Sequence, residues 1–449
     1  MRRILSLAVM CSLAFPAMAL AEEPEAPKEA ADDLAAEYGE EAAEWTEKSP
    51  PKEAEMKMPE PPKMAMDDLE AQGEPEEDGS WKDGLSWQIL ASAFYRLGGY
   101  AGDGVLAGSY NNLLDAEGRQ GYPYTNYNGF GLNFAGGDVM YTGEKFAVRL
   151  DLRFGTGAPL LTPAAPVKQA YAAWMPTEKL NFDLGFFDTI FGAEVVDEWN
   201  NANYTRGALY FLRQPFNHMG LRMGLELTEI VGMTLMVTNG GVYGGTVIDD
   251  NETPALSWQL GFTPDGHNSV RRRGLRDGYR GVGLFVGGSY AASGNDGNQD
   301  WVQFYDVVFS MDLKWAHIIF NGDYYINGSE TSVDTGATGT EFTYGHSLAL
   351  IFDASDHWSI GLRGEHLSGN AYYRDETGPD FGGLATGTIT LRYKPVEYLV
   401  ISMEGRGEWS TSDIYFSRSA TDTDGDGILV PNQKKNYAAI LGVTAHIGN

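Results

Sequence analysis

Residues 146–154 read FAVRLDLRF, and apolar and polar side chains alternate through the whole stretch. Phe146 and Phe154 fall on one side, whereas Arg149 and Arg153 fall on the other. Side chains that alternate with a period of two point to opposite faces of a β-strand. The sequence therefore predicts a strand with one apolar face and one charged face.

The same alternation recurs along the chain from residue 85 to residue 447, in stretches close to the length that a tilted strand needs to cross a bilayer, roughly 9–11 residues. In lipid such strands survive only in a closed barrel, because every backbone group must be hydrogen-bonded internally. We predict sixteen strands, over residues 85–96, 129–141, 146–154, 167–175, 180–187, 217–227, 231–238, 255–264, 281–292, 301–314, 317–327, 341–352, 357–366, 383–393, 399–409 and 437–447.

The predicted connections alternate between short and long. Links such as 142–145 and 394–397 are short, whereas 97–128 and 188–216 are long. This asymmetry and an even strand count are typical of outer-membrane barrels. We therefore predict an all-β fold: an antiparallel transmembrane β-barrel of about 16 strands, with short periplasmic turns and long extracellular loops. A barrel of this size leaves an aqueous channel.

One observation favours a barrel over a soluble β-sandwich, and another leaves the strand count open. A large soluble β-sandwich also alternates, but it requires neither unequal loops at its two ends nor aromatic residues near strand ends, such as Trp87, Trp258 and Trp358. Residues 265–280, DGHNSVRRRGLRDGYR, fall at a short-turn position although they are long and basic. Either this is an unusual periplasmic turn, or the strand count is wrong by a hairpin there.

The first 80 residues have a different composition. A basic start, a short apolar core and small residues before Glu22 predict a signal peptide over 1–21. Residues 22–80 hold 21 acidic side chains against five lysines and are rich in Pro, Ala and Glu. This composition predicts a disordered or partly helical periplasmic arm. Its role is either none beyond disorder, or that of a spacer or of a tether that contacts the cell wall. The barrel then spans 81–449, and the chain's net charge of −30 argues against nucleic acid as a partner.

The third long connection, within residues 186–222, is too apolar for an exposed loop. A short helix over 203–212 that folds into the barrel mouth would bury it. We predict a pore constriction in which loop acids face wall arginines, since opposed charges select ions. Its candidate residues are Glu194, Asp197 and Glu198 on the loop and Arg149, Arg153 and Arg222 on the wall. In the alternative reading, the acids are solvated and the arginines pair with neighbouring Asp151 and Glu226.

The same connection carries a motif: a glycine-and-acid turn, then Asn-Tyr-Thr-Arg, then Pro-Phe-x-His-x-Gly. In this motif the chain resembles the OmpL-like β-barrel porins. The matching residues are Gly192, Asn203, Tyr204, Thr205, Arg206, Pro215, Phe216, His218 and Gly220. The chain departs from the family at residues 190–192, where the family often has a proline before the glycine. The resemblance implies an outer-membrane channel and names no substrate.

These observations predict an outer-membrane porin. It would pass small hydrophilic solutes or ions by diffusion through a lumen narrowed by the third extracellular loop, with membrane lipid and a homotrimer as partners. The alternative is a non-conducting structural barrel, or an adhesin or receptor that uses its outer loops.

Other chemistry has little support. Asp422, Asp424 and Asp426 have the spacing of a calcium loop, but Gln433 stands where such loops have a glutamate. The histidines lack HExxH spacing, and no GxSxG segment occurs. We expect no enzyme activity and no cofactor.

Overall fold

The computed structural model describes residues 84–98, 129–155, 157–158, 162, 164–240, 253–264, 282–293, 300–313, 315–331, 338–369, 383–411, 413, 415 and 433–448. The chain divides into two units, Met1–Glu76 and Glu77–Asn449, and the described residues belong to the second. Four predictions lie outside the described residues: the signal peptide (1–21), the acidic arm (22–80), the basic link (265–280) and the calcium residues Asp422, Asp424 and Asp426.

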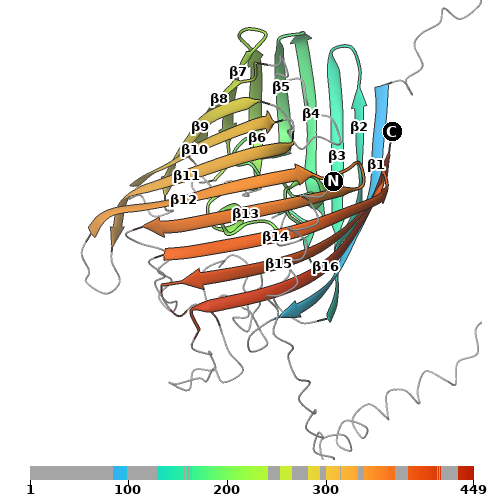
Figure 1. Ribbon diagram of the computed structural model, residues 1–449. Helices are drawn as coiled ribbons and strands as arrows, with labels where there is room; N and C mark the ends of the chain where they lie inside the picture. The colour runs from blue at the N-terminus through green and yellow to red at the C-terminus, as the bar shows by residue number, and fades with distance from the viewer. Residues whose placement is uncertain are drawn as a thin grey trace, which may run out of the picture. The chain divides into compact units, whose positions relative to one another are not determined.

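Sixteen antiparallel strands form a closed barrel in the described part of the chain (Figure 1). Each strand pairs with its neighbours in sequence, and β1 closes the barrel by pairing with β16. The predicted fold is confirmed, and every predicted strand is present. The strands are β1 (Leu85–Gly98), β2 (Gly129–Thr142), β3 (Phe146–Phe154), β4 (Val167–Thr177), β5 (Leu180–Asp188), β6 (Asn217–Glu226), β7 (Val231–Thr238), β8 (Ala255–Phe262), β9 (Gly283–Ser293), β10 (Asp300–Leu313), β11 (Ala316–Thr331), β12 (Thr338–Asp353), β13 (Trp358–Gly369), β14 (Gly383–Val396), β15 (Leu399–Ser410) and β16 (Lys435–Gly448).

Tight turns gather at one end of the barrel, which we call the short-turn edge. They are residues 143–145, 178–179, 227–230, 354–357 and 397–398, together with the link between Leu313 and Ala316. The connection 263–282 begins and ends at this same edge, because β8 and β9 pair directly with each other. No further strand therefore lies between β8 and β9 in the described barrel.

The barrel wall is polar inside and apolar outside. Arg153 in β3 is 0% exposed, whereas the next residue, Phe154, is 53% exposed. The same contrast extends around the barrel, since a strand places successive side chains on opposite faces. Charged side chains buried on the strands are Arg96, Asp138, Arg149, Asp151, Arg153, Lys168, Asp183, Arg222, Asp306, Asp323, Arg363, Glu365, Arg392, Glu404, Arg406 and Glu408. An outward surface of this kind matches hydrocarbon, so the strands are the membrane-spanning elements.

Aromatic pairs mark both ends of the strands. At the short-turn edge, Trp358 stacks on Tyr393 with ring centroids 4.5 Å apart. Near the opposite edge, Trp301 stacks on Tyr290, also at 4.5 Å. Amphipathic rings of this kind favour the level of the lipid headgroups at each side of a membrane. The two groups of rings thus delimit the apolar band of the wall.

Helical structure in the described residues is short. A 3₁₀ turn, η5 (Glu198–Asn200), and one helix, α5 (Ala208–Leu212), both lie in the connection between β5 and β6. Among the described residues, no helix combines the length and the apolar character needed to cross a membrane. The helical segments instead belong to the loop that forms the candidate site.

Candidate functional site

The connection between β5 and β6, residues 189–216, folds into the barrel, and we call it the infolded loop. Its helix α5 is shorter than the predicted 203–212. Ala208, Leu209 and Leu212 of this helix are buried in an apolar cluster with wall residues. The wall members of this cluster are Phe94, Leu367, Leu384 and Ile440, from β1, β13, β14 and β16. Burial against four strands explains why so apolar a segment is stable in a loop.

Ion pairs hold the loop on the β2–β4 side of the wall. The Asp197 carboxylate lies 2.9 Å from the Arg153 guanidinium and 3.2 Å from the Lys168 ammonium. Arg153 also pairs with Asp138 at 2.5 Å. We call these four residues the charged anchor. Each buried charge has an opposite partner, which is the condition for a charge to be tolerated away from water.

On the β13–β15 side, wall carboxylates accept hydrogen bonds from the loop backbone. Glu365 accepts from the N–H groups of Ala208 and Leu209, at 3.1 and 3.0 Å. Glu404 accepts from the N–H groups of Tyr204 and Thr205, at 2.7 and 3.2 Å. The first N–H groups of a helix have no partner within the helix. A carboxylate of a distant strand therefore caps α5.

Wall arginines satisfy the carbonyl groups of the same loop. Arg392 donates to the carbonyls of Asn201 and Glu198, the latter at 2.8 Å. Arg406 donates to the carbonyl of Arg206 at 2.6 Å. Buried backbone groups need such partners, so the wall supplies the hydrogen bonds that an irregular loop cannot make internally.

Glycines on the inner wall allow the loop to approach closely. A Cβ atom at Gly345, Gly361 or Gly442 would collide with the loop. The atoms it would meet are the Leu209 side chain, the Ala202 carbonyl and the Tyr204 ring, respectively. The wall is thus shaped to the loop in strands far apart in sequence.

The six predicted constriction residues have different partners. Asp197 pairs with Arg153, one of the three wall arginines that the prediction names. Glu194 instead lies 2.5 Å from Arg363, an arginine of β13 that the prediction did not include. Glu198 bonds to the hydroxyl of Thr444 at 2.5 Å.

The remaining two arginines have partners on the wall. Arg149 pairs with Asp151 of its own strand at 2.9 Å. Arg222 pairs with Asp183 of β5, also at 2.9 Å. The predicted pairing of these arginines with loop acids is therefore corrected, because inward neighbours on the wall lie closer. A role of all six in a constriction stays a prediction.

The motif residues 203–206 fix the loop to the structure around it. Asn203, Tyr204, Thr205 and Arg206 are all almost completely buried. Their side chains bond, respectively, to Thr390 (2.7 Å), Ser92 (3.0 Å), Glu404 (2.5 Å) and the Val196 carbonyl. The Asn-Tyr-Thr-Arg sequence therefore attaches the middle of the loop to the structure around it.

The flanking motif residues shape the ends of the loop. Gly192 has a φ of +79°, a conformation that favours glycine. After Pro215 ends the helical segment, the ring of Phe216 stacks on Tyr210 with centroids 4.8 Å apart. His218 bonds to the Thr189 hydroxyl at 3.1 Å. Gly220 continues β6, where a Cβ atom would come within 2.7 Å of the backbone of Thr238.

The loop acids have different pKa values for a physical reason. Burial raises the pKa of Glu194 to about 7, and it outweighs the opposing effect of Arg363. Burial likewise raises the pKa of Glu198 to about 7. Burial would also raise the pKa of Asp197, but the nearby charges of Arg153 and Lys168 prevail and lower it to about 2.

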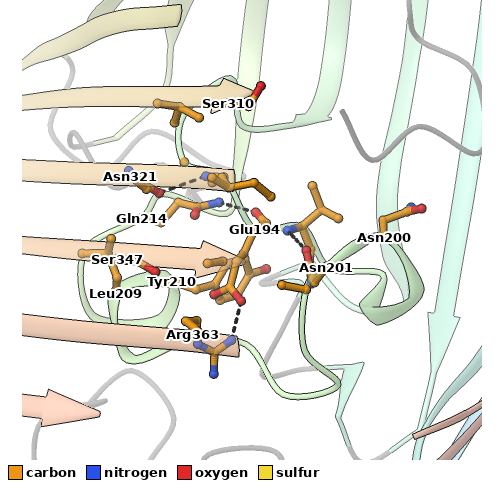
Figure 2. Close-up of a pocket in the computed structure, with 17 residues that line it drawn as sticks. Glu194, Asn200, Asn201, Leu209, Tyr210, Gln214, Ser310, Asn321, Ser347 and Arg363 are labelled. Atoms are coloured by element: carbon orange, nitrogen blue, oxygen red, sulfur yellow. Dashed lines mark hydrogen bonds and ion pairs between the residues drawn. The ribbon is translucent and has the colours of Figure 1, made fainter. Parts of the chain in front are cut away.

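Cavities lie along the inner wall in the part of the chain that the structure describes. One of about 180 Å³ separates the infolded loop from strands β10–β13, and Figure 2 shows Ser310, Asn321 and Ser347 of its wall. Another of about 740 Å³ follows β2–β5 at the short-turn edge and is lined by Tyr171 and Asp183, among others. In the residues that the structure describes, no group of three or more His, Cys, Asp or Glu side chains could hold a metal ion.

Comparison with known proteins identifies the family. The sequence model described as "Putative beta-barrel porin-2, OmpL-like" matches residues 98–433. The chain belongs to this family. It is therefore an outer-membrane porin, a channel rather than an enzyme. The predicted resemblance is confirmed over most of the barrel, and the motif residues lie within the matched range.

Solved structures similar to this porin include an anion-selective porin from Comamonas acidovorans, with a TM-score of 0.52 and 7% identity, covering 81% of this chain and 99% of that one. The outer membrane channel DcaP of Acinetobacter baumannii has a TM-score of 0.46 and 10% identity, covering 81% and 96%. OmpT of Vibrio cholerae has a TM-score of 0.47 and 12% identity, covering 81% and 97%. At such identities the first similarity shows the barrel fold alone. No curated protein matches the chain.

Proposed function

We propose that this porin passes small hydrophilic solutes or ions by passive diffusion, and that the infolded loop narrows the passage. The observation that carries the proposal is the anchoring of the loop inside a wide barrel. Asp197 is held by Arg153 and Lys168 on one side of the wall, and Glu194 is held by Arg363 on the other.

Charge supports a role in ion preference. Glu194, Asp197 and Glu198 bring three carboxyl groups into the barrel interior, close to Arg153 and Arg363. Fixed charges at a narrow point act strongly on passing ions because little water remains to screen them. The preferred sign of charge depends on which groups line the open passage, and the experiment below measures it.

Planar-bilayer recording of the purified porin tests the proposal. We expect stable ion conductance from the wild type and a changed reversal potential in a salt gradient for Asp197→Asn. Asp356→Asn, at an exposed turn on the short-turn edge, is the matched control and should behave as the wild type. Absence of ion conductance in the wild type would contradict the proposal. A reversal potential of Asp197→Asn equal to that of the wild type would show that the charged anchor does not line the ion path.

A second candidate function rests on the extent of the loop contacts. The infolded loop bonds to strands β1–β4, β6, β8, β10, β11 and β13–β16. Contacts on so many strands also suit a plugged barrel that serves as a structural protein, adhesin or receptor. Liposome swelling separates the two: an open porin admits arabinose, whereas a plugged barrel excludes it.

We also propose which partners the barrel contacts. The exposed apolar side chains of the wall would contact outer-membrane lipid, and the barrel would assemble as a homotrimer, which chemical crosslinking in the membrane can test.

We further propose that residues 22–80 lie in the periplasm and contact the cell wall. In support, β1 begins and β16 ends at the short-turn edge, the predicted periplasmic side. Loss of sedimentation with peptidoglycan when 22–80 is removed would support this contact.

A further inference from the structure

Two ion pairs inside the barrel share one arrangement, in which the acid is exposed and the base lies behind it. Asp188, at the end of β5, has a side chain that is 31% exposed and lies 3.0 Å from Lys168, which also pairs with the interior residue Asp197. Glu194 of the infolded loop is 15% exposed and lies 2.5 Å from Arg363 (Figure 2). The side chains of Lys168 and Arg363 are at most 4% exposed. The carboxylates are therefore the members of these pairs that meet the accessible interior.

A third acid has the same arrangement closer to the short-turn edge. Asp312 occupies an inward position of β10, two residues after Ser310, which lines the cavity beside the loop. The Asp312 side chain is 46% exposed, whereas His317, whose Nδ1 bonds to it, is almost completely buried. Exposed carboxyl groups thus occur from the end of β5 to the short-turn edge.

The basic side chains of the interior are covered. In the ion pairs that join described residues, no lysine or arginine side chain is more than 9% exposed. These bases are Arg149, Arg153, Lys168, Arg206, Arg222, Arg363 and Arg406. Buried bases of this kind neutralise their acidic partners and offer little surface to a passing ion.

Exposed lysines of the described barrel lie at strand ends and turns instead. Lys145 and Lys179 are exposed in turns of the short-turn edge, and each directly follows an exposed glutamate, Glu144 or Glu178. Opposite charges on adjacent residues largely cancel at a distance. These lysines therefore do not offset the carboxylates of the interior.

The position of each charge decides which ions it favours. The Coulomb energy between a fixed charge and a passing ion decreases with distance and with screening by water and salt. Where the carboxylate contacts the accessible space and its base lies behind it, the negative member acts on the ion more strongly. Fixed charges of one sign along a narrow passage select ions of the opposite sign.

We propose that the passage prefers cations over anions, and that Asp188, Glu194 and Asp312 set this preference. This inference rests on the proposed function, because it assigns the sign of the ions that pass the infolded loop.

Reversal potentials across a planar bilayer in a KCl gradient at pH 8 test the inference. At this pH Glu194, with a pKa of about 7, carries its charge. We expect a wild-type ratio of K⁺ to Cl⁻ permeability above 1. Asp188→Asn, Glu194→Gln and Asp312→Asn should each lower this ratio about twofold, the effect of one charge across roughly 8 Å of water, and the triple variant should lower it further.

These substitutions leave the buried bases paired. In Asp188→Asn, Lys168 retains Asp197 at 3.2 Å, and in Glu194→Gln, Arg363 retains Glu365 at 3.3 Å. The variants should therefore fold, which circular dichroism and heat resistance in detergent confirm.

Asp356→Asn is the matched control. Asp356 is an exposed acid at the short-turn edge, like Asp312, but it lies in the turn 354–357 rather than on the inner wall. This variant should retain the wild-type permeability ratio, and a fall as large as that of Asp312→Asn would overturn the inference. A wild-type ratio of 1 or below, or a triple variant with the wild-type ratio, would also overturn it while the ion channel stands. Absence of any ion current in the wild type would overturn the proposed function, and the inference with it.

Discussion

The infolded loop meets two contrasting sectors of the same wall. On the β2–β4 side, Arg153 and Lys168 reach across to Asp197 and occupy the space between wall and loop. On the β10–β12 side, Ser310 and Ser347 are too short to do so, and a cavity remains. The loop also bonds to Asp306 and Asn321 on this side, so the length of the inward side chains decides where a cavity remains between loop and wall.

The largest expected effect comes from breaking the charged anchor. Arg153→Ala leaves Asp138 and Asp197 buried without their guanidinium partner, which should lower the free energy of unfolding by about 3–5 kcal/mol. Urea unfolding of the refolded porin in detergent measures this. Ser347→Ala in the cavity sector is the comparison and should change the stability by less than about 0.5 kcal/mol. If the two variants lowered the free energy of unfolding by similar amounts, the two sides of the wall would not differ in how they hold the loop.

A smaller effect is expected where the wall touches the loop through a glycine. Gly361→Ala puts a methyl group against the Ala202 carbonyl of the loop, and such overpacking costs about 1–3 kcal/mol. Gly364→Ala, on the outward face of the same strand, meets nothing within 4 Å and should leave the stability unchanged. Proteolysis of the loop and urea unfolding report both variants. Equal stability of the two would mean that the loop is not held against β13.

A further expected effect is a pH dependence at the edge of the cavity. The pKa of Glu194 is about 7 in the folded porin, above the ordinary value of 4.5, so the folded state binds the proton more tightly. The stabilisation from this group is complete below pH 4.5 and is lost as the pH rises to about 7. Asp197 contributes no change in this range, since its pKa is about 2.

Urea midpoints measured from pH 5 to pH 8 check this prediction. The wild-type midpoint should fall as the pH rises, and Glu194→Gln should show a weaker dependence. A steeper fall in Glu194→Gln than in the wild type would assign the pH dependence to other groups and contradict the explanation.

The barrel could be predicted from the sequence because its strands alternate with a period of two. A pattern such as FAVRLDLRF identifies both the strand and its two faces, independently of any distant residue. Strand ends were less certain: β12 (Thr338–Asp353) extends beyond the predicted 341–352, since polar residues near the end of a strand break the alternation.

The site could be predicted only in part. The apolar composition of the loop revealed that it folds inward, and Asp197 does meet Arg153. The contact of Glu194 with Arg363 joins residues 169 positions apart, and its geometry depends on where the loop crosses the barrel. One signal was present but not used: glycines at inward positions, such as Gly361 and Gly442, indicate where another segment approaches the wall.

The conductance of a porin without the infolded segment tests the central claim most directly. In this variant a short glycine-serine link replaces residues 193–213, and circular dichroism and heat resistance in detergent confirm that the barrel is folded. We predict a single-channel conductance several times that of the wild type, because the charged anchor and α5 no longer occupy the interior. A folded variant with the wild-type conductance would contradict the claim that this loop narrows the channel.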